Sequence, residues 1–322
     1  MSVFVQQQHT VCDFSGSDSW VILSPIEQSI KRKIESVGTP LKDWDIQINY
    51  GIKTGYNVAF IISTAKRNEI LSNTADYVAG QAEKYYAPAG EYARTAALIR
   101  PILRGRDIKR YGYNWAELWL IATFPARHYD IEQYPAVKNY LLSEFGMERL
   151  EQTGKVHIVN GKQIKARKKT NNKWFETQDS ISYFDDFNQP KVMWKIIGCN
   201  INFSFDDNKM MCNNAVDIMT GNREQLLQYV GLMNSKLFDW YLKLTTEAEV
   251  QGGGIQLYVT TLEKTLLKLD FHNDLSIMVE RRISGNIDDA KLDRCVFDSY
   301  QLTQEEQNFI LSCKQVNRVN NR

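Results

Sequence analysis

The distribution of apolar and polar residues along the chain predicts both helices and strands, in no regular order. Leu226, Val230, Leu237 and their neighbours give residues 223–244 an apolar stripe at helical spacing. Asp45–Tyr50 alternates as a strand does, whereas residues 57–62 and 118–124 are apolar runs typical of buried strands. Further strands are predicted at residues 191–197, 201–205 and 255–259, and helices at 65–71, 135–150 and in the tail from about 275. Because strands and helices do not alternate regularly, the pattern favours an α+β fold.

Capping boxes and one turn give sharper local predictions. Ser24–Glu27 has the cap, the proline at the first helical position and the glutamate that open a helix, and Gly38 is a suitable stop. Thr303–Glu306 opens the last helix in the same way. Asn160-Gly161, between two short extended runs, is the favoured two-residue turn of a β-hairpin. Asn234-Ser235 is expected to bend the long helix or to cap a neighbour.

Composition places the chain among ordinary globular proteins. It has 322 residues, 43% of them hydrophobic, which is enough for one large or two medium domains. No apolar run approaches the roughly 18 residues that span a bilayer, and the N-terminus lacks the basic start and apolar core of a signal peptide. The five cysteines are scattered, without a CxxC motif, and there are four histidines. We therefore expect a cytoplasmic, reduced protein without a metal site or a membrane partner.

The motifs of several enzyme classes are missing from the sequence. There is no P-loop, GxGxxG, GxSxG, HExxH or kinase set. Phe14–Asp18 only faintly resembles a glycine-rich S-adenosylmethionine loop, and the Pro-Pro of an amino-methyltransferase element is lacking. Asp185-Asp186 and Lys191 have the wrong spacing for a metal nuclease. The sequence therefore predicts no catalytic residue in this chain.

Total charge favours no particular partner, because 39 Lys+Arg residues face 38 Asp+Glu residues. Positive charge is nevertheless concentrated around the predicted hairpin, where no acidic residue interrupts seven basic ones. They are Lys155, Lys162, Lys165, Arg167, Lys168, Lys169 and Lys173. A basic hairpin of this kind is suited to a DNA groove or a track of phosphates. A solvated, partly disordered loop is the alternative interpretation.

Two further segments are candidates for nucleic-acid contact. Arg104, Arg106, Lys109 and Arg110 form a second basic cluster, and arginine can bind guanine or phosphate through two hydrogen bonds. Alternatively, Arg106 and Asp107 form an ion pair that pins the turn. The loop between two predicted strands offers small, amide and aromatic side chains for reading bases, or is simply a tight turn. Its candidate residues are Lys53, Thr54, Tyr56 and Asn57.

Four distinctive stretches follow one another between about residues 20 and 310. They are Lys33–Trp44 leading into Gly51–Ile61, then Pro101–Tyr111, Pro190–Trp194 and Leu232–Leu237, and the tail Leu292–Ile310 fits with them. In content, order and spacing they resemble the TaqI-like C-terminal specificity domain. That domain belongs to bacterial adenine-N6 DNA methyltransferases of restriction-modification and phage-exclusion systems.

The resemblance implies a target recognition domain, which grips duplex DNA and reads its sequence while a catalytic domain flips and methylates the adenine. The methyl donor S-adenosylmethionine is then the cofactor of that catalytic domain, which is absent from this chain. The chain is accordingly expected to be a C-terminal fragment or a free-standing specificity subunit. In either case its partners are double-stranded DNA and a methyltransferase catalytic domain or subunit of a type II-like system.

The prediction is an α+β chain in three parts. These are a lead-in over residues 1–24, a mixed-sheet DNA target recognition domain over 25–270, and a helical spacer or docking segment over 271–322. The hairpin lysines, Arg167 and the Arg104–Arg110 turn are expected to hold phosphates, and Lys53–Asn57 to read bases. The alternative function is a protein-interaction module that docks a methyltransferase or nuclease subunit without reading DNA.

Overall fold

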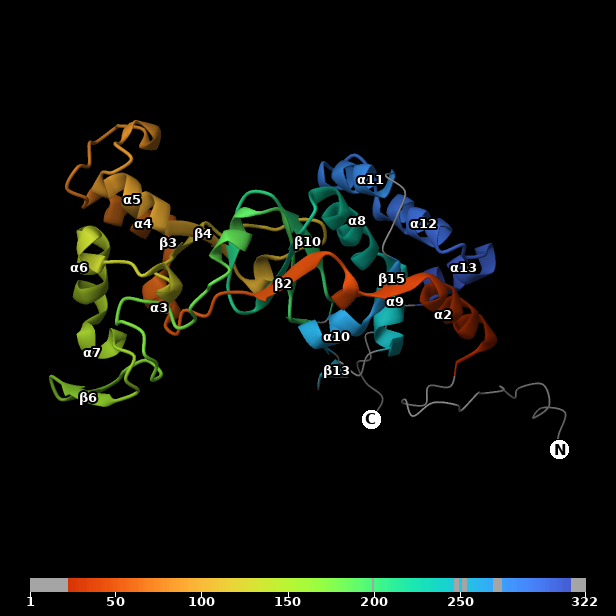
Figure 1. The fold of residues 1–322 in the computed structure, drawn as a ribbon, viewed down its shortest axis with the longest axis horizontal. Helices are drawn as coiled ribbons and strands as arrows, with labels where there is room; N and C mark the ends of the chain where they lie inside the picture. The colour runs from red at the N-terminus through yellow and green to blue at the C-terminus, as the bar shows by residue number, and fades with distance from the viewer. Residues whose placement is uncertain (1–22, 199, 246–248, 251–253, 269–273, 314–322) are drawn as a thin grey trace. The chain divides into compact units, whose positions relative to one another are not determined.

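The computed structural model describes residues 23–198, 200–245, 249–250, 254–268 and 274–313 (Figure 1). The chain divides into two compact units. Unit 1 comprises residues 1–46, 197–201 and 224–322, and unit 2 comprises residues 47–196 and 202–223. The chain enters unit 2 near residue 47 and leaves it near residue 223, with a brief return to unit 1 at residues 197–201. Most of the predicted lead-in, residues 1–22, lies outside the described residues.

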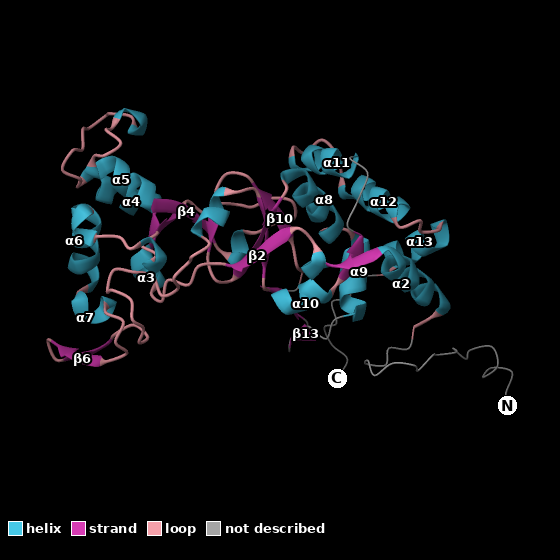
Figure 2. Ribbon diagram, viewed as in Figure 1, coloured by secondary structure: helices cyan, strands magenta, loops and turns pink. Residues whose placement is uncertain are grey.

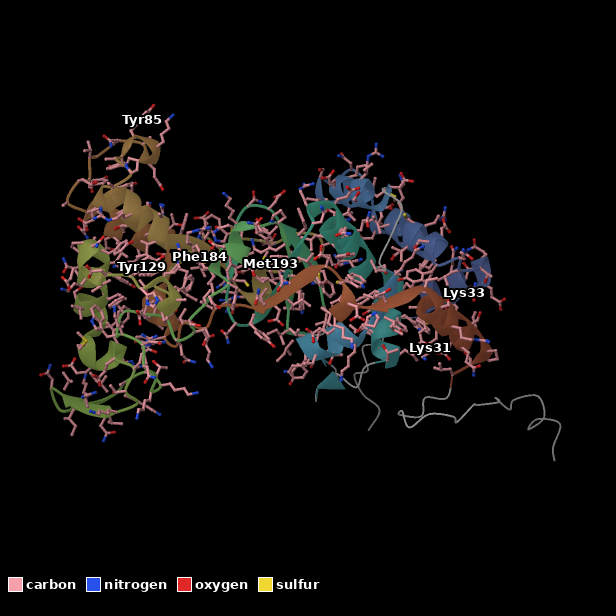
Figure 3. The ribbon with its side chains drawn as sticks, viewed as in Figure 1. Lys31, Lys33, Tyr85, Tyr129, Phe184 and Met193 are labelled. Carbon is pink, nitrogen blue, oxygen red and sulfur yellow. The ribbon has the colours of Figure 1, made fainter. Side chains whose placement is uncertain are left out.

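Unit 2 contains two four-stranded sheets. Their strands are β2 (Ile46–Tyr50), β3 (Ile61–Ser63), β4 (Ile99–Leu103), β5 (Leu118–Ile121), β8 (Lys191–Lys195), β10 (Phe203–Asp206), β11 (Met211–Cys212) and β12 (Val216–Gly221). The order of the first sheet is β10-β8-β12-β2, with β8 antiparallel to both β10 and β12. The order of the second is β11-β4-β5-β3, in which only the β11–β4 pair is parallel. Met193, labelled in Figure 3, is fully buried in β8.

Helices, short turns and one hairpin surround the second sheet. The helices are α3 (Asn57–Phe60), α4 (Thr64–Ser72), α5 (Glu91–Leu98), α6 (Pro135–Phe145) and α7 (Met147–Leu150). Short 3-10 turns occur at Glu83–Tyr85, Gly105–Asp107, Pro125–Arg127, Ile131–Gln133 and Phe184–Asn188. The hairpin consists of β6 (Val156–Val159) and β7 (Lys162–Lys165). A continuous apolar core, which includes Phe60, Ile102, Leu120 and Leu141, joins the sheets to α3 and α6.

Unit 1 is mainly helical, as the cyan ribbons of Figure 2 show. Its helices are α2 (Pro25–Val37), α8 (Arg223–Met233), α9 (Lys236–Thr245), α10 (Val259–Lys264), α11 (Asp274–Ile283), α12 (Asp289–Ser299) and α13 (Gln304–Ser312). Short strands complete it, namely β1 (Gly38–Pro40) with β15 (Leu266–Lys268), and β13 (Glu249–Val250) with β14 (Gly254–Gln256) and β9 (Ile197–Gly198). A 3-10 turn lies at Leu41–Asp43. On α2, Lys33 (labelled in Figure 3) pairs with Glu306 of α13 at 2.6 Å, which ties the two ends of the unit together.

The strongest local signals of the sequence are confirmed. Both capping boxes form, at Ser24–Glu27 and Thr303–Glu306, and α2 begins at Pro25 and ends before Gly38. The chain breaks into α8 and α9 at Asn234-Ser235, where the Ser235 hydroxyl accepts a hydrogen bond from the Phe238 amide at 3.1 Å. The α+β fold with a helical C-terminal segment is likewise confirmed. In the described residues, no helix has the length and apolar character that crossing a membrane requires.

Three element predictions are wrong in part. The apolar run 57–62 begins as the helical turn α3, because the Tyr56 carbonyl accepts hydrogen bonds from Ala59 and Phe60, and only then becomes strand. The helix predicted at 135–150 is two helices, because Gly146 takes a positive φ of 72° between them. The strand predicted at 255–259 ends at Gln256, and Val259 already belongs to α10.

Candidate functional site

The predicted Asn-Gly hairpin forms and is attached to α7 at its base. Asn160 and Gly161 both have positive φ, 49° and 75°, as a two-residue turn of this kind requires. Lys155 and Ala166 continue the ladder below the strands, since the Ala166 amide donates to the Lys155 carbonyl at 2.9 Å. In Figure 1 the hairpin, labelled β6, extends past α7 at one end of unit 2. An isolated two-stranded hairpin is marginal in water, so this attachment is what holds it in place.

The lysines of the basic run are exposed. Lys162 and Lys165 lie on β7, and Lys168, Lys169 and Lys173 follow in the segment after it. Side chains so placed can reach an anionic partner while the surrounding fold stays intact. The exposure of these lysines is consistent with the predicted phosphate contacts, which remain a prediction.

Arg167 differs from its neighbours because its side chain is buried, with 5% exposed. Its guanidinium donates to the backbone carbonyls of Thr54 at 2.7 Å, Glu176 at 2.8 Å, Trp174 at 3.1 Å and Leu150 at 3.3 Å. Burial lowers the pKa of Arg167 to about 10, so the group stays charged at neutral pH. The prediction that Arg167 holds a phosphate is therefore corrected. Its guanidinium is occupied by backbone carbonyls and stabilises the fold instead.

Arg167 also links the hairpin segment to the loop proposed to read bases. Besides the Arg167–Thr54 contact, the Gln178 amide donates to the Thr54 carbonyl at 3.1 Å. The Asp179 amide donates to the Lys53 carbonyl at 3.3 Å. The structure thus brings together the Lys53–Asn57 loop and the hairpin segment, which lie about one hundred residues apart and were predicted as DNA contacts on separate grounds.

Within the loop, the four candidate residues have different surroundings. Thr54 is fully buried, and its hydroxyl bonds to the Asn57 amide oxygen at 2.6 Å, so Thr54 shapes the loop. The prediction that Thr54 contacts a base is therefore wrong, because its side chain is not accessible. Lys53 and Asn57 are exposed, whereas Tyr56 is half-buried under the guanidinium of Arg149, 4.9 Å from its ring centroid. Arg149 also donates to the Lys165 carbonyl at 3.1 Å, which ties the loop to β7.

The second basic cluster begins where β4 of the second sheet ends, and it contacts the first sheet. Tyr111 forms a bridge with Ser204 of β10, and Gly105 approaches Ala215 before β12. An ion pair does pin this turn, but Arg104 rather than Arg106 makes it, with Asp107 at 2.8 Å. Although burial opposes ionisation, the hydrogen bonds from Arg104 hold the pKa of the Asp107 carboxyl below its usual value. The guanidinium of Arg104 is thus used in the ion pair that stabilises the turn, which corrects the prediction that Arg104 holds a phosphate.

The remaining cations of this turn are placed differently from Arg104. Arg106 and Lys109 are exposed, and the Lys109 ammonium donates to the Arg106 carbonyl at 2.9 Å. Arg110 lies over the Tyr111 ring, 5.5 Å from its centroid. Contacts by these three residues with phosphate stay predictions.

The near-zero total charge hides an uneven distribution between the units. Residues 47–223, which contain all of unit 2, carry 24 Lys+Arg against 18 Asp+Glu. The rest of the chain carries 15 against 20. A net charge of about +6 in one unit is the local concentration that a polyanion binder needs.

Three buried charged side chains in the first sheet were not anticipated from the sequence. Lys191 and Asp206 are register partners on β8 and β10 and form a fully buried ion pair of 2.5 Å. Asp217 on β12 is 1% exposed, and burial raises the pKa of its carboxyl to about 7. Asp217 is a charge inside an otherwise apolar run, which is a local signal, whereas Lys191 and Asp206 lie at strand ends, where a charge is ordinary. Within the described ranges, no three His, Cys, Asp or Glu side chains gather as a metal site would require.

Comparison with known proteins identifies one family. A profile of the TaqI-like C-terminal specificity domain matches residues 100–265, a little over half of the chain. The type IIG restriction endonuclease BpuSI shares the fold over 89% of this chain, with a TM-score of 0.51 and 12% identity. The type IIL restriction-modification enzyme MmeI, solved in complex with DNA, gives a TM-score of 0.48 over 85%, with 11% identity. This chain spans 32% of BpuSI and 36% of MmeI. No curated protein matches the chain in sequence.

Proposed function

Because the chain belongs to the family of TaqI-like C-terminal specificity domains, we propose that it recognises a sequence in duplex DNA. We propose further that it directs an adenine-N6 methyltransferase of a type II-like restriction-modification system. In this proposal unit 2 binds the DNA. The transfer of the methyl group takes place in a catalytic part outside these residues, either in the same polypeptide or in a separate subunit.

The observation that carries the proposal is the exposed, acid-free set of lysines on and after the hairpin. Two of these lysines, Lys162 and Lys165, lie on β7, and Lys168 and Lys169 follow it directly. All four belong to the unit that carries the excess positive charge. Each lysine that neutralises a phosphate releases counterions, and this release supplies most of the sequence-independent affinity for DNA. Phosphate contacts fix the register of the protein on DNA, and contacts with base edges then select the sequence.

The proposal also assigns the partners. The catalytic part binds S-adenosylmethionine and flips the target adenine, while this chain holds the flanking duplex. The helices α11 to α13 are the proposed docking surface or spacer for that part. We place the assembly in the cytoplasm, where its DNA substrate lies in a bacterial cell.

The test is selection of duplexes from a randomised DNA pool by the purified chain at low salt, followed by sequencing. We expect enrichment of an asymmetric motif of several base pairs that contains an adenine. Salt-sensitive binding without enrichment would show that the catalytic part is needed to complete the reading site. Absence of binding at any salt would overturn the proposal in favour of a protein-interaction module.

A second measurement assigns the phosphate contacts. Replacing Lys162, Lys165, Lys168 and Lys169 with Ala should flatten the slope of log affinity against log salt by roughly one unit for each lysine that binds a phosphate. The matched control replaces four exposed lysines of unit 1, namely Lys42, Lys236, Lys264 and Lys291. An unchanged slope in the hairpin variant would remove the hairpin from the DNA interface.

A further inference from the structure

The two faces of the β6–β7 hairpin have different surroundings. In the register of the hairpin Val156 lies opposite Lys165, and Ile158 lies opposite Gln163. Directly opposed residues of an antiparallel pair share a face, so these four side chains form one face, here called the outer face. All four are exposed, Ile158 by 75% and Val156 by 57%.

The opposite face of the hairpin is turned towards the body of unit 2. His157 and Ile164 are register partners there, and both are half-buried. The His157 Nε2 atom lies 2.5 Å from a carboxylate oxygen of Glu151, which follows α7 directly. Hydrogen bonds from Thr153 and then from His157 lower the pKa of Glu151, so this carboxylate stays charged and keeps the contact. The outer face is consequently the one left for a partner.

The composition of the outer face is unusual for a solvated surface. Two β-branched aliphatic side chains and one amide lie beside Lys165, and Lys162, Lys168 and Lys169 are exposed nearby in the chain. No described residue forms a hydrogen bond with the side-chain amide of Gln163. An occupant must therefore be strongly anionic and yet offer both apolar groups and hydrogen-bonding edges. Duplex DNA meets these conditions in its major groove, which also has the width to admit a two-stranded β-ribbon.

From these observations we propose that the outer face enters the major groove and reads an A·T base pair, a role that rests on the proposed function. Gln163 pairs with adenine through N6 and N7, as the geometry of a side-chain amide allows. Ile158, opposite Gln163 and with its Cβ atom about 5 Å away, contacts the thymine methyl group. Val156 extends the apolar contact, and the lysines hold the phosphates that flank the groove. Base reading thus belongs to the hairpin as well as to the Lys53–Asn57 loop.

The experiment compares the full chain with its Gln163→Ala and Ile158→Ala variants in selection from the randomised pool. Gln163→Ala should reduce the preference for adenine at one position of the motif by roughly 5- to 150-fold, the range of a bidentate base contact. Replacing the paired thymine with uracil removes only its methyl group and should weaken the wild type roughly fourfold. Ile158→Ala should be insensitive to that replacement, because its methyl contact is already gone.

Two control variants separate base reading from other effects. Ile197→Ala removes an exposed isoleucine of unit 1, 56% exposed, and should leave both the motif and the response to uracil unchanged. Lys168→Ala should weaken binding to all sequences alike and leave the motif intact. Since the outer-face side chains are exposed, the thermal unfolding of the variants should match that of the wild type.

The outcomes distinguish this inference from the proposed function. A wild-type motif that survives both substitutions, with an unaltered response to uracil, overturns the inference and leaves the proposed function standing. Salt-sensitive binding by the wild type without any motif also overturns it, because a hairpin that reads an A·T pair would select that pair even while the rest of the reading site awaits the catalytic part. Failure of the wild type to bind any DNA overturns the proposed function, and this inference with it.

Discussion

Arg167 donates hydrogen bonds to four backbone carbonyls, while Lys168 and Lys169 beside it are exposed. Arg167→Ala should therefore lower the free energy of unfolding by roughly 2–4 kcal/mol, because four buried hydrogen bonds from the guanidinium to backbone carbonyls are lost at once. Urea unfolding measures the change. Lys168→Ala, the adjacent control, should stay within about 0.5 kcal/mol of the wild type. Equal effects of the two substitutions would contradict the structural role of Arg167.

Asp217 makes stability depend on pH in a definite direction. Its carboxyl stays protonated in the folded chain up to about pH 7, whereas its ordinary pKa is 3.8. Between these values the folded state binds the extra proton, so the free energy of unfolding falls as pH rises through this window. Tyr183 and Cys212, which interact with Asp217, do not titrate in this window, because burial raises the pKa of both, that of Tyr183 to about 12.

Asp217→Asn should remove this dependence. Relative to the wild type, the free energy of unfolding of the variant should rise by roughly 2–3 kcal/mol between pH 5 and pH 8. Urea unfolding at both pH values gives the comparison, in which titrations common to the two proteins cancel. Asp185→Asn, which alters an exposed carboxylate, should keep the wild-type dependence. A parallel pH response of Asp217→Asn and the wild type would refute the assignment to Asp217.

At the scale of elements, the hairpin is attached through its base and can be shortened without disturbing its register. Replacing residues 156–165 with Asn-Gly places a two-residue turn directly on the Lys155–Ala166 pair, which already has the ladder hydrogen bond. The free energy of unfolding should change by no more than about 1–2 kcal/mol, because the outer face buries little and the inner-face residues His157 and Ile164 are only half-buried. DNA affinity should fall sharply, as measured by fluorescence anisotropy. Unaltered binding by a folded shortened chain would exclude the hairpin from the interface.

Elements could be predicted from the sequence where a local hydrogen-bond pattern determines the conformation. The caps at Ser24 and Thr303 and the Asn160-Gly161 turn satisfy their own backbone groups, so each was readable from a few adjacent residues. The run 57–62 was not, because an apolar run has no period that separates a helical turn from a strand. There the contacts of Thr54 with Asn57 and Arg167 set the path of the chain.

In the candidate site, too, some features could be predicted from local sequence and others depend on tertiary contacts. The exposure of the lysines agrees with their run in the sequence, but nothing local distinguishes Arg167 from Lys168. Their difference comes from carbonyls at residues 54, 150, 174 and 176, which only tertiary folding brings to one point. The pairing of Arg104, rather than Arg106, with Asp107 likewise depends on the 3-10 turn at Gly105–Asp107. The charge pattern of the sequence indicates which segment is basic, but tertiary packing determines which of its side chains are exposed to a partner.

At the scale of the whole molecule, residues 47–223 carry an excess of positive charge and the rest of the chain an excess of negative charge, which favours unit 2 as the proposed site of DNA contact. Amide hydrogen exchange of the full chain, with and without a selected duplex, tests this assignment. We expect protection in residues 53–57 and 155–173 on DNA binding, because phosphate and base contacts should suppress local opening of the loop and the hairpin. Helices α11 to α13 should exchange at the same rate in both samples.

A duplex of unrelated sequence at the same salt separates the two kinds of contact. Sequence-independent binding uses the phosphates alone, so this duplex should protect the lysine-bearing segment after β7 and leave the Lys53–Asn57 loop exchanging as in the free chain. Protection that spreads equally over both units with either duplex would mean that charge separation does not direct binding. Protection confined to α11–α13 would instead place the DNA on the unit with the negative excess, contrary to the electrostatic argument.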